Sequence, residues 1–549
     1  MTTNFPSRVR VNTRDVDHAI RAGSLPMQRL FDPRRGGLPY FFNTMSGPTP
    51  SNGHHVSFSI SHIPGRWLNA LLNAEAVAGV EIGEGVIENL RGWAIRSLDN
   101  PMHLPSCVDL QTFEPVLVSD LHNLRESAHA MHALIVYRAD DRAAQLIDQQ
   151  IRTVDKYLDF DSGQWNEQAF TRETGGRTSF SPLDELRPIG FTDEAYVEGT
   201  TFPRTFGRYI GPLVKLYRDV GIDSALSQAI RLTRLAMDTV LLETGEYDPI
   251  IHGAHTHSTT SMLSGVALLG ELLGDRLILD RVDVFMKNGL TKIAKDFGWC
   301  TENFNRGDHY GEINNTVDLI ETSFVLARAG YPGHYQRAER MIRAHLLPAQ
   351  LLDTPFIPDW DEPEADFHHL MAQRSYGAFG FPCPYGHEYE DDGWISFNWD
   401  IVGGGVSGLC EVVRNRVTTN GGMTSINLLF DHDDDRVAFT SPYGESPVAV
   451  IAAKRDGTYR LRVSDWTPLN EITVNHSSDQ ISSTVSGQWL YLFGMKAGDQ
   501  VEVAFPLVES TSYYSIKGDP FSIDWQGDAV VATSEGSRRL RFFPARGEQ

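Results

Sequence analysis

The feature that most constrains the fold is a unit of two helices joined by a short turn, which recurs from about residue 60 to about residue 415. Residues 137–141 lead into 143–147 in one copy, and residues 217–223 lead into Ala225 in another. The same turn returns at residues 272–276. Glycine or aspartate at each turn ends one helix and caps the next, so the pattern predicts antiparallel helix pairs.

Apolar residues repeat at helical spacing throughout this part of the chain, as Leu68, Leu71 and Leu72 do on one face. The pattern predicts about twelve helices, or about six pairs. The later ones cover residues 203–218, 224–241, 257–273, 277–292, 314–329 and 334–347, with weaker ones at 366–376 and 403–414. Six pairs can close into a ring whose inner helices line a funnel, and a ring needs no capping repeats. We therefore predict an (α/α)6 toroid over residues 21–416 rather than an open solenoid.

From about residue 417 the apolar period changes from that of a helix to that of a strand. Residues 424–430, 459–463 and 501–505 alternate as half-buried strands do, and turn signals such as Asp456-Gly457 separate them. This pattern predicts an antiparallel β-sandwich over residues 417–549. Residues 1–20 are assigned to an N-terminal segment, in which residues 9–11 could add a strand to the β domain.

The overall charge restricts the partners of the protein. A net charge of −23 argues against nucleic acid and anionic membranes, because both require a basic surface. No apolar run approaches the length of a membrane span, and the N-terminal residues lack the apolar core of a signal peptide. Four scattered cysteines fit reduced thiols in a cytoplasmic protein. A homo-oligomer stays open.

Polar and aromatic side chains gather in the segments before the predicted inner helices, where a toroid would hold a binding site. The richest segment is residues 374–400. Sugars bind to planar hydrogen-bonding groups and aromatic faces, and glycosidic hydrolysis needs a carboxylic acid with a second group that attacks or activates water. The inventory therefore favours a carbohydrate-active enzyme.

Three short motifs allow two interpretations each. His255 and His257 could be metal ligands, but alternation in an extended segment would separate them, which favours hydrogen bonding to substrate. Residues 403–405 (GGG) lack the lysine and hydroxyl of a phosphate loop, which favours close helix packing. Arg125 and Glu126 could pair on their helix or contact the substrate.

Several segments together resemble a known family. In the β domain these are residues 461–466 (LRVSDW), 487–491 and 496–502, and in the barrel they are residues 122–126 (HNLRE), 255–257 and 315–317. They are similar to the β-L-arabinofuranosidases of glycoside hydrolase family 127, a resemblance that spans nearly the whole chain. It implies a six-pair helical barrel joined to β-sandwich domains. The β-glucuronidases on similar helical barrels are a close comparison.

The chain departs from this family at the catalytic metal. The family holds a cysteine nucleophile on zinc with a glutamate and further cysteines. Its Glu-Thr-Cys segment corresponds to Asn315-Thr316-Val317 here, and its cysteine pair has no counterpart near residues 398–400. Without these ligands we expect neither zinc nor another cofactor, so carboxylates must carry the reaction.

We predict an exo-acting glycoside hydrolase that removes a terminal uronic acid, such as a β-glucuronide, or L-arabinofuranose from an oligo- or polysaccharide. The general acid is Glu302, onto which the family's acid maps approximately, or Glu312; the base or nucleophile is Asp318 or Asp400. Arg125 and Arg374 would pair with a uronate carboxylate. The remaining substrate-binding candidates are His122, His255, His257, His309, Asn315, Tyr385, His387 and Trp394.

Three rival functions use the same inventory. A uronate-specific lyase would use Tyr385, His309 or His387 as the base, with Arg374 neutralising the carboxylate. A sugar epimerase or isomerase would use the pair His255 and His257, although such enzymes usually lack a C-terminal sandwich. A carbohydrate-binding protein without catalysis is the third rival.

Overall fold

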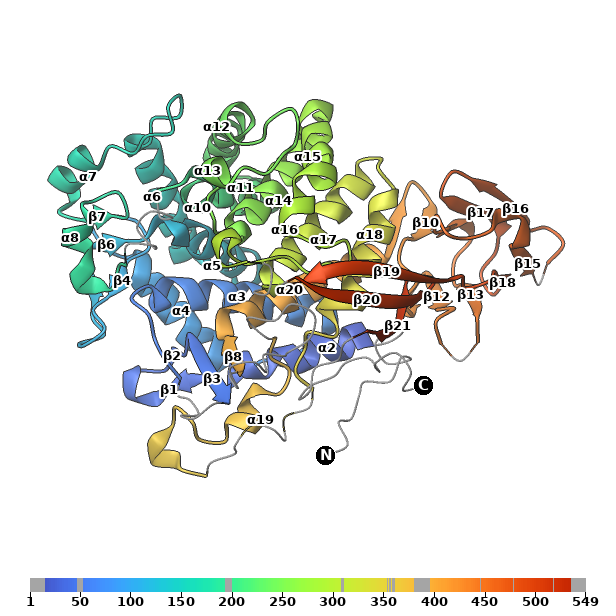
Figure 1. Cartoon of the computed structure of the whole chain (residues 1–549), viewed down its shortest axis with the longest axis horizontal. Coiled ribbons are helices and arrows are strands. Elements are labelled where there is room, and N and C mark those ends of the chain that lie inside the picture. Colours follow the sequence, from blue (N-terminus) through green and yellow to red (C-terminus); the bar gives the residue numbers. More distant parts are fainter. Residues whose placement is uncertain are drawn as a thin grey trace.

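The computed structural model describes residues 15–46, 53–192, 200–307, 311–352, 354, 357, 361–379, 395–444, 446–476, 478–516 and 518–534. A helical barrel and a β-sandwich lie side by side along the longest axis of the molecule (Figure 1). No helix in these ranges is long and apolar enough to cross a membrane.

Six helices in the described part of the chain form a closed ring. Each packs against the next, and the last packs back against the first. They are α3 (Ser59–Ala78), α5 (Leu124–Arg138), α11 (Ile210–Val220), α14 (Thr256–Leu273), α17 (Ile313–Arg328) and α20 (Trp399–Arg416). Most of their residues are buried, whichever face of the helix they occupy, as expected for an inner layer. The predicted toroid is confirmed.

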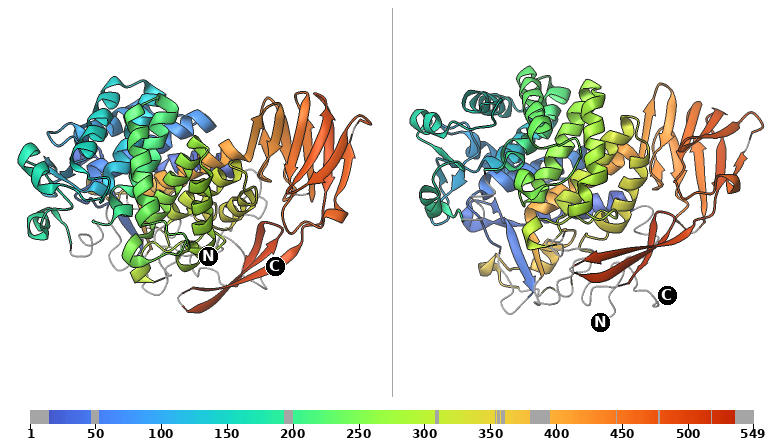
Figure 2. Two further views of the ribbon diagram at one scale, coloured as in Figure 1. Left: turned by 90° about the horizontal axis from the view of Figure 1, so that it is seen from above. Right: turned by 45° about the horizontal axis from the view of Figure 1, so that its top comes forward.

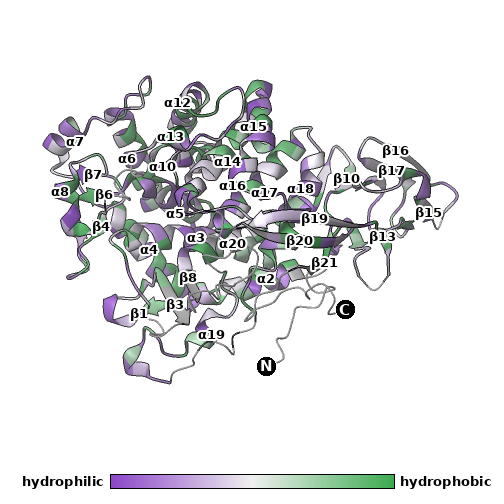
Figure 3. Cartoon of the chain, viewed as in Figure 1, coloured by the Kyte–Doolittle hydropathy of each residue, from purple (hydrophilic) through white to green (hydrophobic). Residues whose placement is uncertain are grey.

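A second layer of helices covers the ring and alternates with the inner helices along the chain. Its members are α2 (Asp15–Ser24), α4 (Glu84–Leu98), α6 (Asp141–Tyr157), α12 (Asp223–Thr239), α15 (Arg276–Asn288) and α18 (Gly333–Met341). Both hydrophilic and hydrophobic stretches are visible on α12 and α15 (Figure 3). Asp140 and Asp275 cap α6 and α15 by accepting backbone N–H bonds, as the turn pattern predicts.

The outer helix that covers α20 differs from the prediction. It is α2, whose Val16 and Ile20 are fully buried, rather than residues 366–376, which contain only the short helix α19 (Met371–Ser375). The chain after α19 passes close to α2: Gly377 has a φ of +91°, and a Cβ there would lie 1.9 Å from the carbonyl oxygen of Ala22. The predicted domain boundary at residue 20 thus falls inside α2, and residues 9–11 lie outside the described ranges.

The predicted helix at residues 203–218 is also divided. The short helix α10 (Phe202–Thr205) and a 3₁₀ turn, η5 (Gly207–Tyr209), precede α11. Pro212 is the third residue of α11, where its missing N–H removes no intrahelical hydrogen bond. Proline therefore marks the true start of this inner helix.

The β-sandwich consists of two five-stranded sheets, ordered β16-β17-β14-β10-β9 and β11-β12-β13-β18-β15. All neighbours are antiparallel except β10 and β14, which are parallel. Alternate residues such as Ile451, Leu461 and Val501 fill the space between the sheets. The strands are β9 (Val417–Asn420), β10 (Met423–Ile426), β11 (His432–Asp433), β12 (Val437–Thr440), β13 (Val448–Ala453), β14 (Gly457–Arg462), β15 (Thr473–His476), β16 (Ser482–Ser486), β17 (Trp489–Met495) and β18 (Gln500–Ala504).

A third, three-stranded sheet reaches back from the sandwich to the barrel (Figure 2). It contains β19 (Glu509–Ile516), β20 (Asp519–Gln526) and β21 (Ala529–Thr533). The Tyr514 hydroxyl donates a hydrogen bond to Asp296 at 2.6 Å, and its ring lies 5.0 Å from that of Phe297. These contacts hold the three-stranded sheet against the helical domain.

Short elements fill the connections around the ring. Strand β3 (Phe42–Ser46) pairs with β8 (Ile395–Asn398), and β8 leads directly into α20. The other pairs are β1 (Phe31–Asp32) with β2 (Leu38–Pro39), β4 (Cys107–Val108) with β5 (Pro115–Val116), and β6 (Val118–Ser119) with β7 (Arg177–Thr178). The short helices are α7 (Glu167–Thr174), α8 (Leu183–Leu186), α13 (Pro249–His252) and α16 (Leu290–Ile293).

Candidate active site

The first turns of the inner helices bring ionisable side chains together at one end of the barrel. His255 and Glu312 are the N-cap residues of α14 and α17, and Asp400 is the second residue of α20. We call this group the axial cluster: His62, Arg66, His122, Glu126, His255, His257, Glu302, Glu312, Asp318 and Asp400. It joins residues that are hundreds of positions apart in the sequence.

Four imidazoles run across the axial cluster. The rings of His62 and His122 are stacked with centroids 5.2 Å apart, and His122 meets His255 edge-on at 5.8 Å. His257 follows at 5.8 Å from His255. Burial, with a further contribution from the Arg208 charge, holds the pKa of His122, His255 and His257 well below its usual value. These three rings are therefore neutral near pH 7, and each offers one hydrogen-bond donor and one acceptor.

Glu312 is a buried carboxyl group with a raised pKa. Its Oε1 accepts a hydrogen bond from the Asn314 amide at 2.5 Å and lies 3.6 Å from His257 Nδ1. Burial raises the pKa of Glu312 to about 8, and the negative charges of Asp400 and Glu302 act in the same direction. Glu312 consequently keeps its proton at neutral pH and can donate it.

Asp400 lies in the same cluster but has the opposite electrostatic environment. His62 Nε2 donates to its Oδ2 at 3.2 Å, and Arg66 Nε lies 3.7 Å from the same oxygen. Burial alone would raise the pKa of Asp400, but the His62 hydrogen bond and the Arg66 charge outweigh it and hold the pKa below its usual value. Asp400 is therefore ionised, and two carboxyl groups of one cluster differ in protonation state.

Asp318 lies beside one of the imidazoles. Its Oδ2 accepts a hydrogen bond from the Thr260 hydroxyl at 2.9 Å and lies 3.4 Å from His257 Nε2, without a hydrogen bond between the two. Its Oδ1 lies 3.5 Å from a guanidinium nitrogen of Arg125. Burial raises the pKa of Asp318 to about 6 although the Arg125 charge opposes this.

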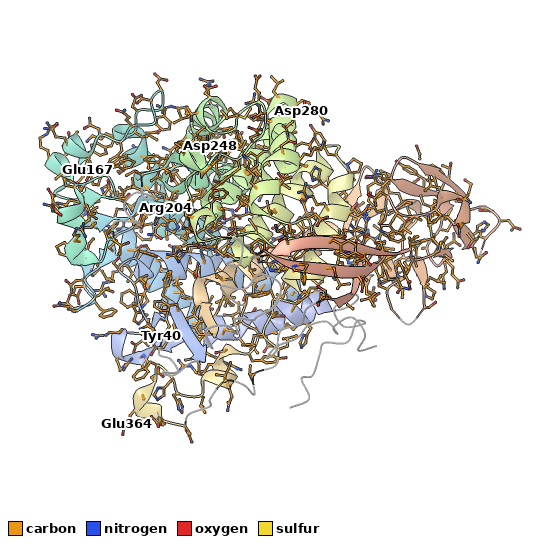
Figure 4. All side chains as sticks on the ribbon, viewed as in Figure 1. Tyr40, Glu167, Arg204, Asp248, Asp280 and Glu364 are labelled. Atoms are coloured by element: carbon orange, nitrogen blue, oxygen red, sulfur yellow. The ribbon has the colours of Figure 1, made fainter. Side chains whose placement is uncertain are left out.

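A layer of ion pairs closes the barrel beneath the carboxylates. Glu126 is fully buried, and nitrogens of Arg66, Arg125 and Arg208 lie 3.0, 3.1 and 2.8 Å from its Oε1. Burial opposes ionisation of Glu126, but Arg208 and Arg66 hold its pKa well below the usual value. The predicted pairing of Arg125 with Glu126 is therefore present. Arg204, labelled in Figure 4, lies 3.7 Å from Asp120 Oδ2, and its charge helps to lower the pKa of His122 and His255.

Several buried polar atoms of the axial cluster have no hydrogen-bond partner among the described residues. They include Arg66 Nε, His122 Nδ1, Glu126 Oε2, His257 Nε2 and Asp400 Oδ1, and in the adjoining layer Arg208 Nε and Nη1. Buried polar atoms in proteins are nearly always paired, with protein, water or ligand. Such a concentration at one point is typical of a site that binds a polar molecule.

The other predicted site residues have different positions. Glu302 lies at the edge of the cluster, 3.7 Å from His255 Nε2. The Asn315 amide donates to Thr256 Oγ1 and to the Thr301 carbonyl, each at 2.8 Å, and so holds α17 against the start of α14. His309, Tyr385, His387 and Trp394 lie outside the described residues.

Arg374 is not part of the axial cluster. Its guanidinium donates to the backbone carbonyls of Arg29, Asp366 and His369 and pairs with the Asp366 carboxylate. These bonds fix the loop around α19, so the predicted pairing of Arg374 with a substrate carboxylate does not fit its position. The sequence alone does not show whether an arginine in a polar loop will donate its hydrogen bonds to backbone carbonyls or to a ligand.

Sequence reasoning missed three residues of the site, His62, Arg66 and Arg208. The first two lie four positions apart on α3, and their neighbours on that helix are buried and mostly apolar. A polar pair on an otherwise apolar helix that lines the barrel is a pattern from which both residues could have been predicted as site residues. Arg208 lies in the turn η5, just before α11. The predicted helix of residues 203–218 included this position, so Arg208 was not recognised as a residue that precedes an inner helix.

The zinc site of the resembled family does not fit this structure. Asn315 and Thr316 use their side chains for internal hydrogen bonds, and Val317 offers no ligand atom. Elsewhere in the described residues, one donor atom each from His255, His257 and Glu312 lies within 4.8 Å of the others. A tetrahedral zinc ion would need these atoms about 3.4 Å apart. His257 Nδ1 and Glu312 Oε1, which are 3.6 Å apart, come close to this separation, whereas the set as a whole spans up to 4.8 Å.

Comparison with known proteins supports the fold. No protein-family model matches the sequence, and no curated protein matches it either. Among solved structures, a family 127 β-L-arabinofuranosidase from Geobacillus stearothermophilus T6 is similar over 94% of this chain and 80% of its own, with 12% identity and a TM-score of 0.52. A protein described as a glycoside hydrolase is similar over 92% and 85%, with 9% identity and a TM-score of 0.52. The resemblance to family 127 is thus confirmed as a similarity of fold.

Proposed function

We propose that the protein is an exo-acting glycoside hydrolase in which Glu312 is the general acid and Asp400 is the general base or nucleophile. The observation that carries the proposal is a pair of buried carboxyl groups in one cluster, one protonated and one ionised. Glycosidic cleavage needs this pair, because one group protonates the leaving oxygen while the other attacks or activates water. Arg66 interacts electrostatically with both groups, which supports a common centre for the two.

The closed barrel supports action at a chain end. The ion pairs around Glu126 fill the axis directly beneath the carboxyl groups, so a polysaccharide cannot pass through the ring. A sugar that reaches Glu312 therefore enters from the side of the helix N-termini and ends at this layer. Such a dead end favours removal of one terminal residue.

The polar groups of the site support a sugar with a carboxylate. Neutral His122, His255 and His257 suit hydroxyl groups, which both donate and accept. Guanidinium groups of Arg66, Arg204 and Arg208 interact electrostatically with His255, and N–H groups of Arg66 and Arg208 remain unpaired. A terminal uronic acid would satisfy such donors. L-arabinofuranose, the sugar of the family that shares the fold, is the neutral alternative.

The decisive experiment is hydrolysis of a panel of nitrophenyl glycosides that includes β-D-glucuronide and L-arabinofuranosides. Wild-type protein should release nitrophenol from one of them, and Glu312→Gln should lower kcat by about 100-fold to 10,000-fold. Glu302→Gln is the matched control, because this glutamate lies at the edge of the same cluster. Normal turnover by Glu312→Gln, or a loss only in Glu302→Gln, would refute the assignment of the acid.

The proximity of His255 and His257 favours one second candidate, a sugar epimerase, since two imidazoles 5.8 Å apart could remove and return a proton on opposite faces. An epimerase would release no nitrophenol but would exchange deuterium from solvent into a free sugar. A lyase would instead form an unsaturated product that absorbs in the ultraviolet. One panel read by nitrophenol release, deuterium exchange and ultraviolet absorbance separates all three.

A further inference from the structure

The far end of the barrel contains a second polar space. Where the inner helices end, a cavity of about 710 Å³ opens along the axis. Every inner helix contributes to its wall, for example through Asn73, His129, Lys215, Glu271, Glu321 and Ser407. Its floor contains Arg66 and Asp318, two members of the axial cluster, and Arg125, which pairs with Glu126 in the layer of ion pairs. The cavity and the candidate active site therefore lie back to back on one axis.

We propose that this cavity is a second binding site, which takes an uncharged, hydroxyl-rich molecule of the size of a mono- or disaccharide. Its volume lies within the range of small-molecule pockets in proteins. Nothing in the proposed hydrolysis uses it, because the ion-pair layer separates it from Glu312 and Asp400.

The charges in the wall are matched in pairs, which argues for a neutral ligand. Lys215 pairs with Glu321 at 2.7 Å, and Arg328 pairs with Glu271 through two hydrogen bonds of 2.7 Å. At the rim, Arg414 pairs with Glu411 at 2.6 Å and Arg218 with Asp219 at 2.7 Å. Paired charges give little net attraction for an ion. They still present alternating donors and acceptors, which is what a set of hydroxyl groups requires.

His129 supplies the observation that a merely solvated opening would not explain. Its side chain is buried in the wall, and its Nδ1 has no hydrogen-bond partner among the described residues. Burial, and then the charges of Arg125 and Lys215, lower its pKa well below the usual value, so it is a neutral ring. An unpaired imidazole nitrogen at such a place is expected to have a partner. A ligand hydroxyl could either donate to it or accept from it.

Glycines let the inner helices pack closely beside this cavity. Gly403 and Gly404 of α20 are among its lining residues, and a Cβ on Gly404 would lie 1.8 Å from Asn314 Oδ1. A Cβ on Gly403 would meet the Arg66 carbonyl oxygen at 3.0 Å, so this glycine lets α20 approach α3. The close helix packing predicted for this motif is therefore present.

Binding is tested in the Glu312→Gln background, so that no sugar is consumed. L-arabinose and cellobiose serve as neutral probes and glucuronate as the charged comparison, each titrated while the imidazole NMR signal of His129 is followed. His129→Leu identifies that signal by its loss. Calorimetric titration of the same variant should show binding of the neutral probe weakened by about tenfold, as for the loss of one hydrogen bond. Ser407→Trp should fill the cavity and abolish the response.

The control is Glu312→Gln with His257→Asn, which alters the axial cluster and should leave the His129 response unchanged. A saturable shift of His129 with a neutral sugar, lost in Ser407→Trp, supports the second site. If the His129 signal does not move with either neutral probe, or moves equally in a correctly folded Ser407→Trp variant, the proposal is wrong. Because none of these measurements requires turnover, they hold whether or not the protein is a hydrolase.

Discussion

Two buried groups of charges in this molecule differ in how completely they are paired. At the junction of barrel and sandwich, Glu339 of α18 pairs with Arg343 at 2.7 Å and also with Arg462 of β14, while Arg462 lies 3.5 Å from Asp528. The Leu429 backbone N–H and the Trp466 indole complete the acceptors of Glu339 and Asp528. None of these four charged side chains has an unpaired buried atom.

The axial cluster contrasts with this junction. It is as deeply buried, yet Arg66, Arg208, His257 and Asp400 each keep at least one polar atom without a hydrogen-bond partner among the described residues. A fully paired network holds two domains together, whereas a partly paired network keeps hydrogen-bonding capacity for another molecule. This difference distinguishes buried ion pairs that stabilise the fold from buried charged groups that are available to bind a ligand.

Of the changes that test this difference, a substitution in the axial cluster should have the largest effect, and that effect should be on catalysis. Asp400→Asn removes the ionised carboxylate but keeps the shape of the side chain, so kcat should fall by about 100-fold to 10,000-fold. The free energy of unfolding should change little, because the amide can still bond to His62. Steady-state kinetics with the best nitrophenyl glycoside, together with thermal unfolding, measures both. Near-normal kcat would remove Asp400 from the mechanism.

The matching change at the junction should act on stability instead. Glu339→Gln removes one partner of a buried ion-pair network, which leaves Arg343 without its counter-charge and Arg462 with Asp528 alone. We expect a loss of about 3–5 kcal/mol in the free energy of unfolding, with unchanged kcat per folded molecule. Denaturant unfolding and active-site titration test this. Equal free energies of unfolding for wild type and variant would show that the pairing of these charges does not stabilise the fold.

A smaller effect is expected in the pH dependence of stability. The pKa of Glu312 is raised from 4.5 to about 8 in the folded protein, so the unfolded chain loses this proton first as pH rises. The folded state is therefore fully stabilised below pH about 4.5 and loses that contribution as pH rises toward about 8. Glu312→Gln does not titrate, and it should be more stable than wild type at pH 8 but similar at pH 4.

Thermal unfolding of both proteins across this pH range gives the comparison. The same protonation predicts that wild-type activity falls as pH rises through about 8, when the acid loses its proton. Identical pH–stability curves for wild type and Glu312→Gln would contradict the raised pKa.

The sequence predicted the architecture better than the site. Helical spacing and aspartate caps such as Asp140 and Asp275 sufficed for the ring, because these signals are local. The helix over α20 was misassigned, since α2 comes from the other end of the chain and only tertiary packing pairs them. The same limit applies to the site. The loops before the inner helices indicated His122, His255 and Glu312, which lie in the axial cluster, and equally Arg374, which does not.

The smallest effect is expected from removal of divalent metal, and it tests the axial cluster as a hydrogen-bonding site. The donor atoms of His255, His257 and Glu312 are close enough to attract a cation, yet they are spread more widely than tetrahedral coordination allows. The Asn314 amide donates to Glu312 Oε1, the oxygen that faces His257 Nδ1. We therefore expect dialysis against EDTA to change kcat by less than about twofold, measured beside a sample dialysed without it. Loss of activity that returns with zinc would mean that these three side chains contract around a metal, and that the unpaired atoms of the cluster serve coordination rather than the sugar.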